Sequence, residues 1–369
     1  MPLSPARLEP IFSPRPWGVL SLAPLFPEKS NLAEPIGEAW MTGNDCRFAN
    51  GDYSGKTLGE AWPQMSAEWT GIWTGEWTGE PGADAPAERP TLFPLLVKFI
   101  FASEKLSVQV HPDDAYASRH EKAAGGKGKT EMWYTLRAQD NAAVLAGLKP
   151  GVTRDAFKSA IGSGAAEDCI ESVSMRPGEA IFIPAGTAHT IGPGLVLCEI
   201  QQHSDLTYRV YDYNRRDAQG NARPLHVDKA LEVMRFGKQT CAKLDPVAIP
   251  DGPAKSVKKE YLVACPYFVT ERWQLSGPLA LASSPHHLDI FIFLEGHGSL
   301  QWKGAEAAYK PAQVWLIPAA LGEFRIEPAP GSDATTILRT YAPPSLDHFA
   351  RELAHRGIPD SAAQSLIHR

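Results

Sequence analysis

The stretch LSVQVHP, residues 106–112, alternates polar and apolar side chains and then ends in proline. A period of two is that of a β-strand, so Ser107, Gln109 and His111 share one face while the two valines share the other. The valines suit a buried layer, and proline ends the strand just after His111. Buried polar groups need partners, so the polar face is predicted to line a cavity, where a metal ion would be a suitable partner.

Two further segments offer metal ligands beside this strand. In GKTEMWY, residues 128–134, the side chains of Lys129 and Glu131 share a strand face. In IPAGTAHTIG, residues 183–192, a turn of small residues delivers His189 at the start of the next strand. Two imidazoles and a carboxylate, with an amide oxygen nearby, fit Zn²⁺, Mn²⁺ or Fe²⁺ better than Mg²⁺ and leave a position open for water or substrate.

The rest of the chain reads as mainly β, with many turns joining short strands. Glycine and proline contribute 31 and 32 of the 369 residues. Strands are predicted where β-branched and aromatic runs lie between Gly, Pro or Asp, at residues 95–101, 106–111, 131–136, 180–183, 195–201 and 206–211, and again at 267–275, 287–294, 298–303, 313–317, 323–327 and 335–341. Short helices are predicted at 153–161 and 227–236.

The two series of strands predict two domains. A chain of this length is long enough for one large core or two ordinary ones. We expect an N-terminal catalytic domain with the metal site over residues 1–245 and a C-terminal β domain with a tail over residues 246–369.

Composition excludes several classes of partner. The formal net charge is −6, which argues against binding to nucleic acid or to an anionic membrane. The chain contains no run of about 18 apolar residues, and its N-terminus lacks the pattern of a secretion signal. We therefore expect a soluble, cytoplasmic protein. The five cysteines show no paired spacing, which indicates reduced thiols.

One stretch falls outside this pattern. Trp69, Trp73 and Trp77 recur every four residues in EWTGIWTGEWTGE, but the repeated Thr-Gly disfavours a helix. We expect a loop held down by its tryptophans and assign it no function.

Several of these segments together resemble the type I mannose-6-phosphate isomerase family in its bacterial form. The matching blocks are IGEAWMTG, FPLLVKFIFASEKLSVQVHPDD, GKTEMWY and PGEAIFIPAGTAHTIGPGLVLCEIQQHSDLTYRVYDYNRR. They span roughly residues 35–215, while the region beyond about 250 matches only in outline. The resemblance implies a fold of two cupin-type β-barrels (jelly rolls) with a few short helices.

The resemblance also implies roles for individual residues. Gln109, His111, Glu131 and His189 would hold one metal ion per chain, usually zinc, and Arg209 matches the catalytic arginine of the family. Lys98, Ser107 and Lys129 fall on positions that line the substrate pocket. The C-terminal barrel shows no recognisable metal set, so His286, His287 and His297 are expected to be structural.

The implied reaction interconverts mannose 6-phosphate and fructose 6-phosphate through a cis-enediol. Arg209 would stabilise the enediolate, because arginine stays charged at any working pH. The sequence leaves the base open: Lys129 with a lowered pKa, a carboxylate or a hydroxide at the metal could each serve. We expect a sugar-phosphate substrate and a monomer or homodimer. An isomerase of another aldose, a non-catalytic sugar-binding cupin and a cupin oxygenase are the alternatives.

Overall fold

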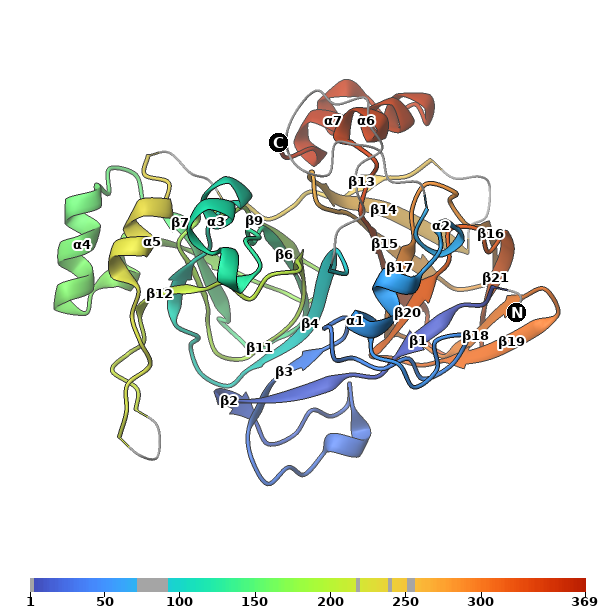
Figure 1. The fold of residues 1–369 in the computed structure, drawn as a ribbon, viewed down its shortest axis with the longest axis horizontal. Coiled ribbons are helices and arrows are strands. Elements are labelled where there is room, and N and C mark those ends of the chain that lie inside the picture. The colour runs from blue at the N-terminus through green and yellow to red at the C-terminus, as the bar shows by residue number, and fades with distance from the viewer. Residues whose placement is uncertain (1–2, 72–91, 217–219, 238–240, 251–255) are drawn as a thin grey trace.

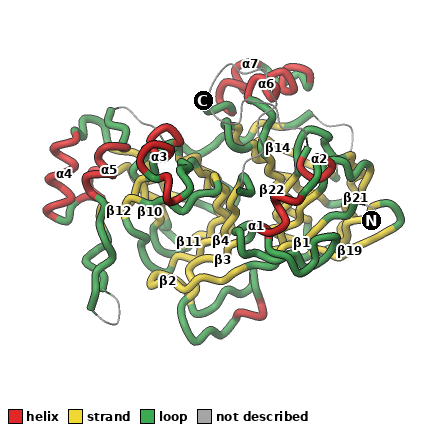
Figure 2. Tube along the Cα trace, in the orientation of Figure 1, coloured by secondary structure: helices red, strands yellow, loops and turns green. Residues whose placement is uncertain are grey.

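The computed structural model describes residues 3–71, 92–216, 220–237, 241–250 and 256–369. Two bodies of β-strands lie side by side, and helices cover their outer surfaces (Figure 1, Figure 2). The mainly β fold predicted from the sequence is confirmed.

The first body is built from two antiparallel sheets that enclose the candidate site. Its six-stranded sheet has the order β2 (Ile11–Val19), β3 (Ile36–Trp40), β4 (Leu95–Ala102), β11 (Leu195–Gln202), β6 (Glu131–Ala138) and β9 (Ala180–Ile183). Its five-stranded sheet has the order β12 (Tyr208–Tyr211), β5 (Val108–Val110), β10 (His189–Ile191), β7 (Ala143–Leu148) and β8 (Ile170–Ser174).

The second body repeats this design. Its seven-stranded sheet has the order β1 (Ala6–Leu8), β20 (Gln313–Ile317), β17 (Asp289–Glu295), β22 (Thr335–Tyr341), β15 (Val269–Leu275), β14 (Val257–Ala264) and β13 (Val247–Ala248). Its four-stranded sheet has the order β16 (Leu279–Ala282), β21 (Glu323–Pro328), β18 (Gly298–Trp302) and β19 (Ala305–Tyr309). Because β1 comes from the start of the chain, the second body contains a strand from outside residues 246–369.

The α-helices are short. They are α1 (Leu58–Ala61), α2 (Ala67–Thr70), α3 (Asp114–His120), α4 (Arg154–Ser163), α5 (Val227–Val233), α6 (Leu346–His355) and α7 (Asp360–Leu366). The Thr153 side chain accepts a hydrogen bond from Ala156 N at the start of α4, as the sequence predicts for an N-cap. Among the described residues, no helix is long and apolar enough to cross a bilayer.

The two faces of β5 are used as the alternation predicts. Val108 and Val110 are fully buried in an apolar cluster with Phe157 of α4 and Ala230 of α5. These two helices therefore close the outside of the barrel at this strand. With the apolar face occupied in this way, the polar face is left for the interior of the barrel.

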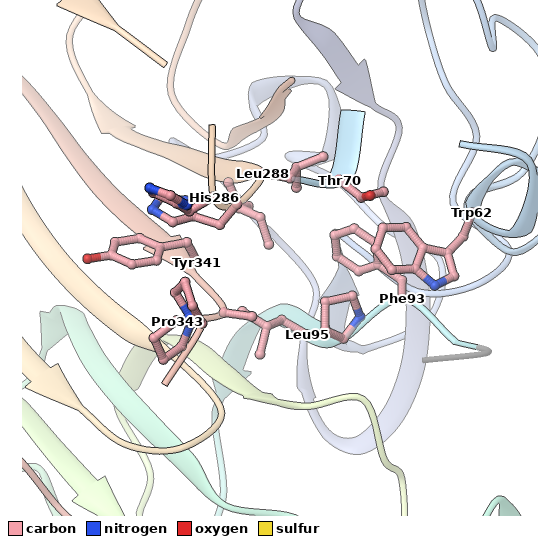
Figure 3. Close-up of a pocket in the computed structure, with 13 residues that line it drawn as sticks. Trp62, Thr70, Phe93, Leu95, His286, Leu288, Tyr341 and Pro343 are labelled. Carbon is pink, nitrogen blue, oxygen red and sulfur yellow. The ribbon is translucent and has the colours of Figure 1, made fainter. Parts of the chain in front are cut away.

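The two bodies meet across aromatic and proline side chains. Figure 3 shows Trp62 and Phe93 at one end of a small pocket and His286 and Tyr341 at the other. This pocket, about 20 Å³ in volume, has room for about one water molecule and is lined largely by apolar side chains. We regard it as a packing feature of the junction.

The tryptophan-rich stretch contributes to the same region. Trp69 in α2 is buried and packs edge-on against Tyr53. Trp73 and Trp77 lie outside the described residues.

Candidate metal centre and substrate pocket

Three buried side chains from separate strands converge inside the first barrel. His111 follows β5, Glu131 is the first residue of β6 and His189 is the first residue of β10. Each side chain is at most 1% exposed, and their candidate ligand atoms all lie within 4.8 Å of one another. The sheets therefore bring together residues that are up to 78 positions apart in the sequence.

Backbone carbonyls fix the orientation of both imidazoles. His111 Nδ1 lies 2.6 Å from Leu206 O, and His189 Nδ1 lies 2.9 Å from Thr187 O, so each Nδ1–H donates to a carbonyl. The two Nε2 atoms then carry lone pairs, and they lie 3.8 and 3.3 Å from Glu131 Oε1. Carbonyl partners of this kind orient histidine ligands in metal sites.

The donor set fits a divalent metal ion. Glu131 Oε1 is buried and has no hydrogen-bond partner among the described residues. Two imidazole lone pairs and a carboxylate oxygen that face one another repel unless a cation lies between them. His111, Glu131 and His189 could therefore hold a metal ion.

Burial keeps both histidines neutral. Desolvation, with Lys129 as the next contribution, lowers the pKa of His189 to about 3. Desolvation also lowers the pKa of His111 well below its usual value. Metal binding needs the deprotonated imidazole, so both side chains are ready to coordinate at neutral pH.

Gln109 lies at the edge of this group. It is paired with His189 across β5 and β10, and its Nε2 is 3.3 Å from His189 Nε2. An amide offers oxygen and nitrogen in nearly the same shape, so turning this side chain over would aim Oε1 at the same position. Gln109 could thus supply a fourth, oxygen ligand.

Lys129 lies beside the three candidate ligands. Its ammonium pairs with Glu131 Oε2 and lies 3.2 Å from His111 Nε2 and 3.7 Å from Glu199 Oε1. Desolvation alone would lower the pKa of Lys129, but the two carboxylates outweigh it and raise the pKa above its usual value. The two carboxylates therefore favour the charged form of Lys129.

A polar cavity of about 460 Å³ opens next to these residues. The residues on its wall that the sequence singled out are Lys98, Ser107, Gln109, Lys129 and Arg209. The structure therefore brings them to one place, beside the three-residue ligand cluster.

Two of the cations in this cavity are held in place by neighbours. Arg209 donates from Nε to Ser107 Oγ at 3.2 Å and from Nη1 to Pro224 O at 3.1 Å. Lys98 is buried, and its Nζ lies 3.3 Å from Asp205 Oδ1 and 4.3 Å from the centre of the Trp40 ring.

Sequence reasoning missed Glu199, a buried carboxylate in the same cavity. Trp133 Nε1 donates to its Oε1 at 3.0 Å, and Lys98 Nζ lies 4.0 Å from its Oε2. Burial raises the pKa of Glu199, with Lys129 opposing the shift. A usable signal was present, because Glu199 is the single charged residue in the otherwise uncharged strand β11.

Other charged residues of the cavity wall carried no local signal in the sequence. Arg15 and Glu38 come from the N-terminal strands, Asp205 from the loop before β12, and Arg223 from the segment after it. They reach the cavity only through the fold.

Comparison with known proteins agrees with this geometry. The chain is 34% identical over 330 residues to the probable mannose-6-phosphate isomerase GmuF of Bacillus subtilis, covering 88% of this chain and 96% of the relative. It is 32% identical over 340 residues to the mannose-6-phosphate isomerase ManA of the same organism, covering 89% and 97%. No family model matches the chain.

Solved structures support the same assignment. The crystal structure of mannose 6-phosphate isomerase from Bacillus subtilis matches with a TM-score of 0.77 at 30% identity, covering 91% of this chain and 99% of that one. A mutant phosphomannose isomerase from Salmonella typhimurium shares the fold with a TM-score of 0.67 at 16% identity, covering 92% and 100%. With this sequence identity over nearly the whole length of its relatives, the chain belongs to the mannose-6-phosphate isomerase family.

Proposed function

We propose that this protein is a metal-dependent aldose-ketose isomerase that interconverts mannose 6-phosphate and fructose 6-phosphate through a cis-enediol. The observation that carries the proposal is the convergence of His111, Glu131 and His189 beside a pocket rich in arginine and lysine. A proton moves between C1 and C2 in this reaction, so negative charge develops on two adjacent oxygens. A metal site beside a cavity with fixed cations on its wall suits that need.

The metal proposed is zinc, one ion per chain, held by Gln109, His111, Glu131 and His189. Zinc is supported by the two neutral imidazoles and the single carboxylate, a set that suits zinc better than magnesium. When bound, the ion supplies Lewis-acid stabilisation of charge on the substrate oxygens.

Arg209 is proposed to stabilise the enediolate. Ser107 and the Pro224 carbonyl hold its guanidinium on the wall of the cavity. A guanidinium fixed before the reaction needs little reorganisation as charge develops, which is the basis of electrostatic catalysis. Its charge persists at any working pH.

Glu199 is the carboxylate best placed to move the proton. It lines the cavity, and the Trp133 indole fixes one of its oxygens. Lys129 lies 3.7 Å away and would act as a cation that stabilises the carboxylate and the bound substrate. Of the three bases that the sequence leaves open, we therefore propose the carboxylate.

Lys98 and Ser107 are proposed to bind the substrate. Both lie on the cavity wall, Lys98 beside Glu199 and Ser107 beside Gln109, where a hydroxyl or a phosphate oxygen could meet them. Ser107 can donate to the substrate while accepting from Arg209.

The test is an isomerase assay on the full chain before and after chelation, coupled to detection of fructose 6-phosphate. Mannose 6-phosphate, glucose 6-phosphate and free mannose are compared. We expect turnover of mannose 6-phosphate that chelation removes and Zn²⁺ restores. If another of these sugars is converted faster than mannose 6-phosphate, that sugar is the substrate instead. If none of the three sugars is converted, the alternatives are a sugar-binding protein or, where metal-loaded protein consumes oxygen, an oxygenase.

We also propose a cytoplasmic location and a monomer or homodimer. The location is supported by the five cysteines, all of which are free thiols. Size-exclusion chromatography with light scattering would distinguish the two oligomeric states.

A further inference from the structure

The second barrel repeats the strand order of the first. In the first barrel the larger sheet runs β3-β4-β11-β6-β9, and in the second it runs β14-β15-β22-β17-β20. The smaller sheets match in the same way, β5-β10-β7-β8 against β16-β21-β18-β19. The strands that carry the candidate metal ligands therefore have counterparts in the second barrel, and the pairing registers identify the corresponding residues, whereas β12 with Arg209 has no counterpart in the four-stranded sheet.

Those registers place two charged residues of the second barrel where two charged residues of the active-site cavity lie. Glu199 of β11 pairs with Lys98 on one side and with Trp133 on the other. The corresponding row of the second barrel is Arg339, paired with Glu271 and Phe291. The acidic and basic positions are thus exchanged between the barrels.

The candidate metal ligands are only partly matched in the second barrel. Glu131, the first residue of β6, corresponds to Asp289, the first residue of β17. The pair His189 and Gln109, however, corresponds to Glu323, which is exposed, and Ala282. The second barrel therefore keeps a carboxylate at this position without the imidazoles.

A polar cavity of about 180 Å³ lies at this position in the second barrel. Arg339 Nη1 is 2.7 Å from Glu271 Oε1, and its Nη2 is 2.9 Å from Asp289 Oδ1. Its guanidinium also lies against the rings of Trp273 and Tyr341, 5.5 and 4.6 Å from their centres. These contacts hold the guanidinium in one orientation.

Hydrogen-bonding capacity remains in this cavity. Arg339 Nε, Asp289 Oδ1 and His287 Nδ1 are buried, and in the described part of the chain none of these atoms makes a hydrogen bond. Asp289 Oδ1 lies 2.9 Å from Arg339 Nη2 and 3.1 Å from His287 Nδ1, but neither contact has the geometry of a hydrogen bond. Buried donors and acceptors of this kind are normally satisfied, by protein, by water or by a ligand.

The charge of the cavity selects a neutral ligand. Its wall carries three cations, Lys259, Arg339 and Arg356, and three carboxylates, Glu271, Asp289 and Glu352. The active-site cavity instead carries five cations, Arg15, Lys98, Lys129, Arg209 and Arg223, against three carboxylates, Glu38, Glu199 and Asp205. A phosphate group is bound best where cations outnumber carboxylates, and on the wall of the second cavity the two are equal in number.

We propose that the second barrel binds an unphosphorylated monosaccharide in this cavity and does not convert it. Sugar hydroxyls both donate and accept hydrogen bonds, so they can satisfy the arginine, the carboxylates and His287 together. The aromatic side chains of Trp273, Phe291 and Tyr341 shape the cavity, as is usual where a few polar groups orient a small ligand. This site is separate from the proposed isomerase site.

The test is isothermal titration of the metal-loaded full chain with D-mannose and with D-fructose. The variants are Asp289→Asn and Glu271→Gln, which preserve shape, with Glu306→Gln on β19 as the control. We expect saturable binding of one of the sugars at millimolar concentration, weakened at least about tenfold in both cavity variants and unchanged in the control. The turnover of mannose 6-phosphate should stay at the wild-type level in all three variants, since none of these residues lies in the active-site cavity.

Two outcomes would overturn the proposal. One is the absence of saturable binding of either sugar to the wild-type protein. The other is sugar binding that is unchanged in both cavity variants, with melting temperatures showing that they are folded, because the sugar would then lie elsewhere. If the isomerase assay failed but the sugar bound in the second barrel, only the proposed isomerase function would be excluded. The two proposals can therefore be tested independently.

Discussion

Gln109 and His189 lie directly opposite each other on the antiparallel strands β5 and β10, with their Nε2 atoms 3.3 Å apart. The pairing register, set by the backbone, therefore brings an amide beside an imidazole. Since Thr187 O already holds Nδ1 of the histidine, Nε2 is the ring nitrogen that would face a metal ion once the amide turns its oxygen toward the same position. We therefore propose His189 as a primary ligand and Gln109 as an auxiliary one.

The first prediction concerns metal affinity. His189→Ala should weaken zinc binding by more than about 100-fold, whereas Gln109→Ala should weaken it by about 10-fold to 100-fold. Competition with a chromogenic chelator measures both values. His355→Ala, an exposed residue at the end of α6, is the control and should bind zinc like the wild type. Equal affinity in the wild type and His189→Ala would contradict the assigned site.

The second prediction concerns Arg209. Replacing it by methionine should lower kcat by about 10²-fold to 10³-fold, the effect of removing one fixed group that stabilises developing charge. Zinc content should not change, because Arg209 is not a ligand. Arg216→Met, an exposed arginine a few residues further along, is the matched control. Steady-state kinetics that are unchanged in Arg209→Met would exclude its catalytic role.

The third prediction concerns proton transfer by Glu199. Glu199→Gln keeps the shape of the side chain and an acceptor for the Trp133 indole, but it removes the basic carboxylate. We expect kcat to fall by about 10²-fold to 10⁴-fold, and exchange of the C1 or C2 proton with deuterated water to be lost with it. Glu171→Gln, on the exposed part of β8, should behave like the wild type.

Two results would count against this role of Glu199. If the variant still exchanged the proton at the wild-type rate, another group would be the base. If the wild-type enzyme converted the sugar with no solvent deuterium at C1 or C2, a hydride shift or a fully shielded transfer would be favoured over exchangeable proton transfer.

The fourth prediction concerns acid stability through Glu260 and Arg272. Burial alone would raise the pKa of Glu260, but hydrogen bonds from Lys258 and Arg272 outweigh it, and the pKa lies below its usual value. A carboxylate with a lowered pKa stabilises the fold above the pKa of the unfolded state, and this contribution is lost as pH falls through the folded pKa. The loss should therefore begin below about pH 5.

Thermal unfolding at pH 7 and pH 4 measures this contribution. At pH 7, Glu260→Gln should be less stable than the wild type by about 1–3 kcal/mol, because it breaks a charged hydrogen bond. The difference between the two proteins should shrink at pH 4. Arg272 also donates to Gly178 O of the first barrel, so the loss should loosen the junction between the barrels. An unchanged difference at both pH values would contradict the account.

The fold could be predicted from the sequence to the extent that strands carry local signals. The strand predicted at residues 180–183 is β9 at Ala180–Ile183, and the strand predicted at 335–341 is β22 at Thr335–Tyr341. These runs are dense in branched and aromatic residues. The helix predicted at 227–236 ends at Val233. Beyond it the backbone leaves the helix and bonds to another segment, where Arg235 N donates to Gly186 O.

Other elements could not be read from local pattern. The N-terminal strand β1 is three residues long and exists because it pairs with β20 near the far end of the chain. The pair β7 and β8 has alternation too weak to separate from loops. Pairing over such distances depends on the complete sheet, which no local window of sequence contains.

The candidate site shows the same division. Gln109, His111 and Glu131 carry a period-two pattern that places them on inner strand faces, and the family resemblance adds Arg209. Glu199 could have been found as the lone charge in an otherwise uncharged strand. The charged residues supplied by the N-terminal strands and by the loops around β12 enter the cavity through sheet order alone, so the sequence pattern gave no reason to choose them.

Zinc-dependent isomerisation is tested most directly by titrating the metal-free protein with Zn²⁺. Two quantities are measured on the same samples: the bound zinc and the rate at which fructose 6-phosphate forms from mannose 6-phosphate. We predict that activity rises in proportion to bound zinc and levels off at one ion per chain, and that His111→Ala shows neither binding nor turnover. Full turnover of mannose 6-phosphate by the metal-free protein, or zinc binding at that ratio without any turnover, would contradict this prediction.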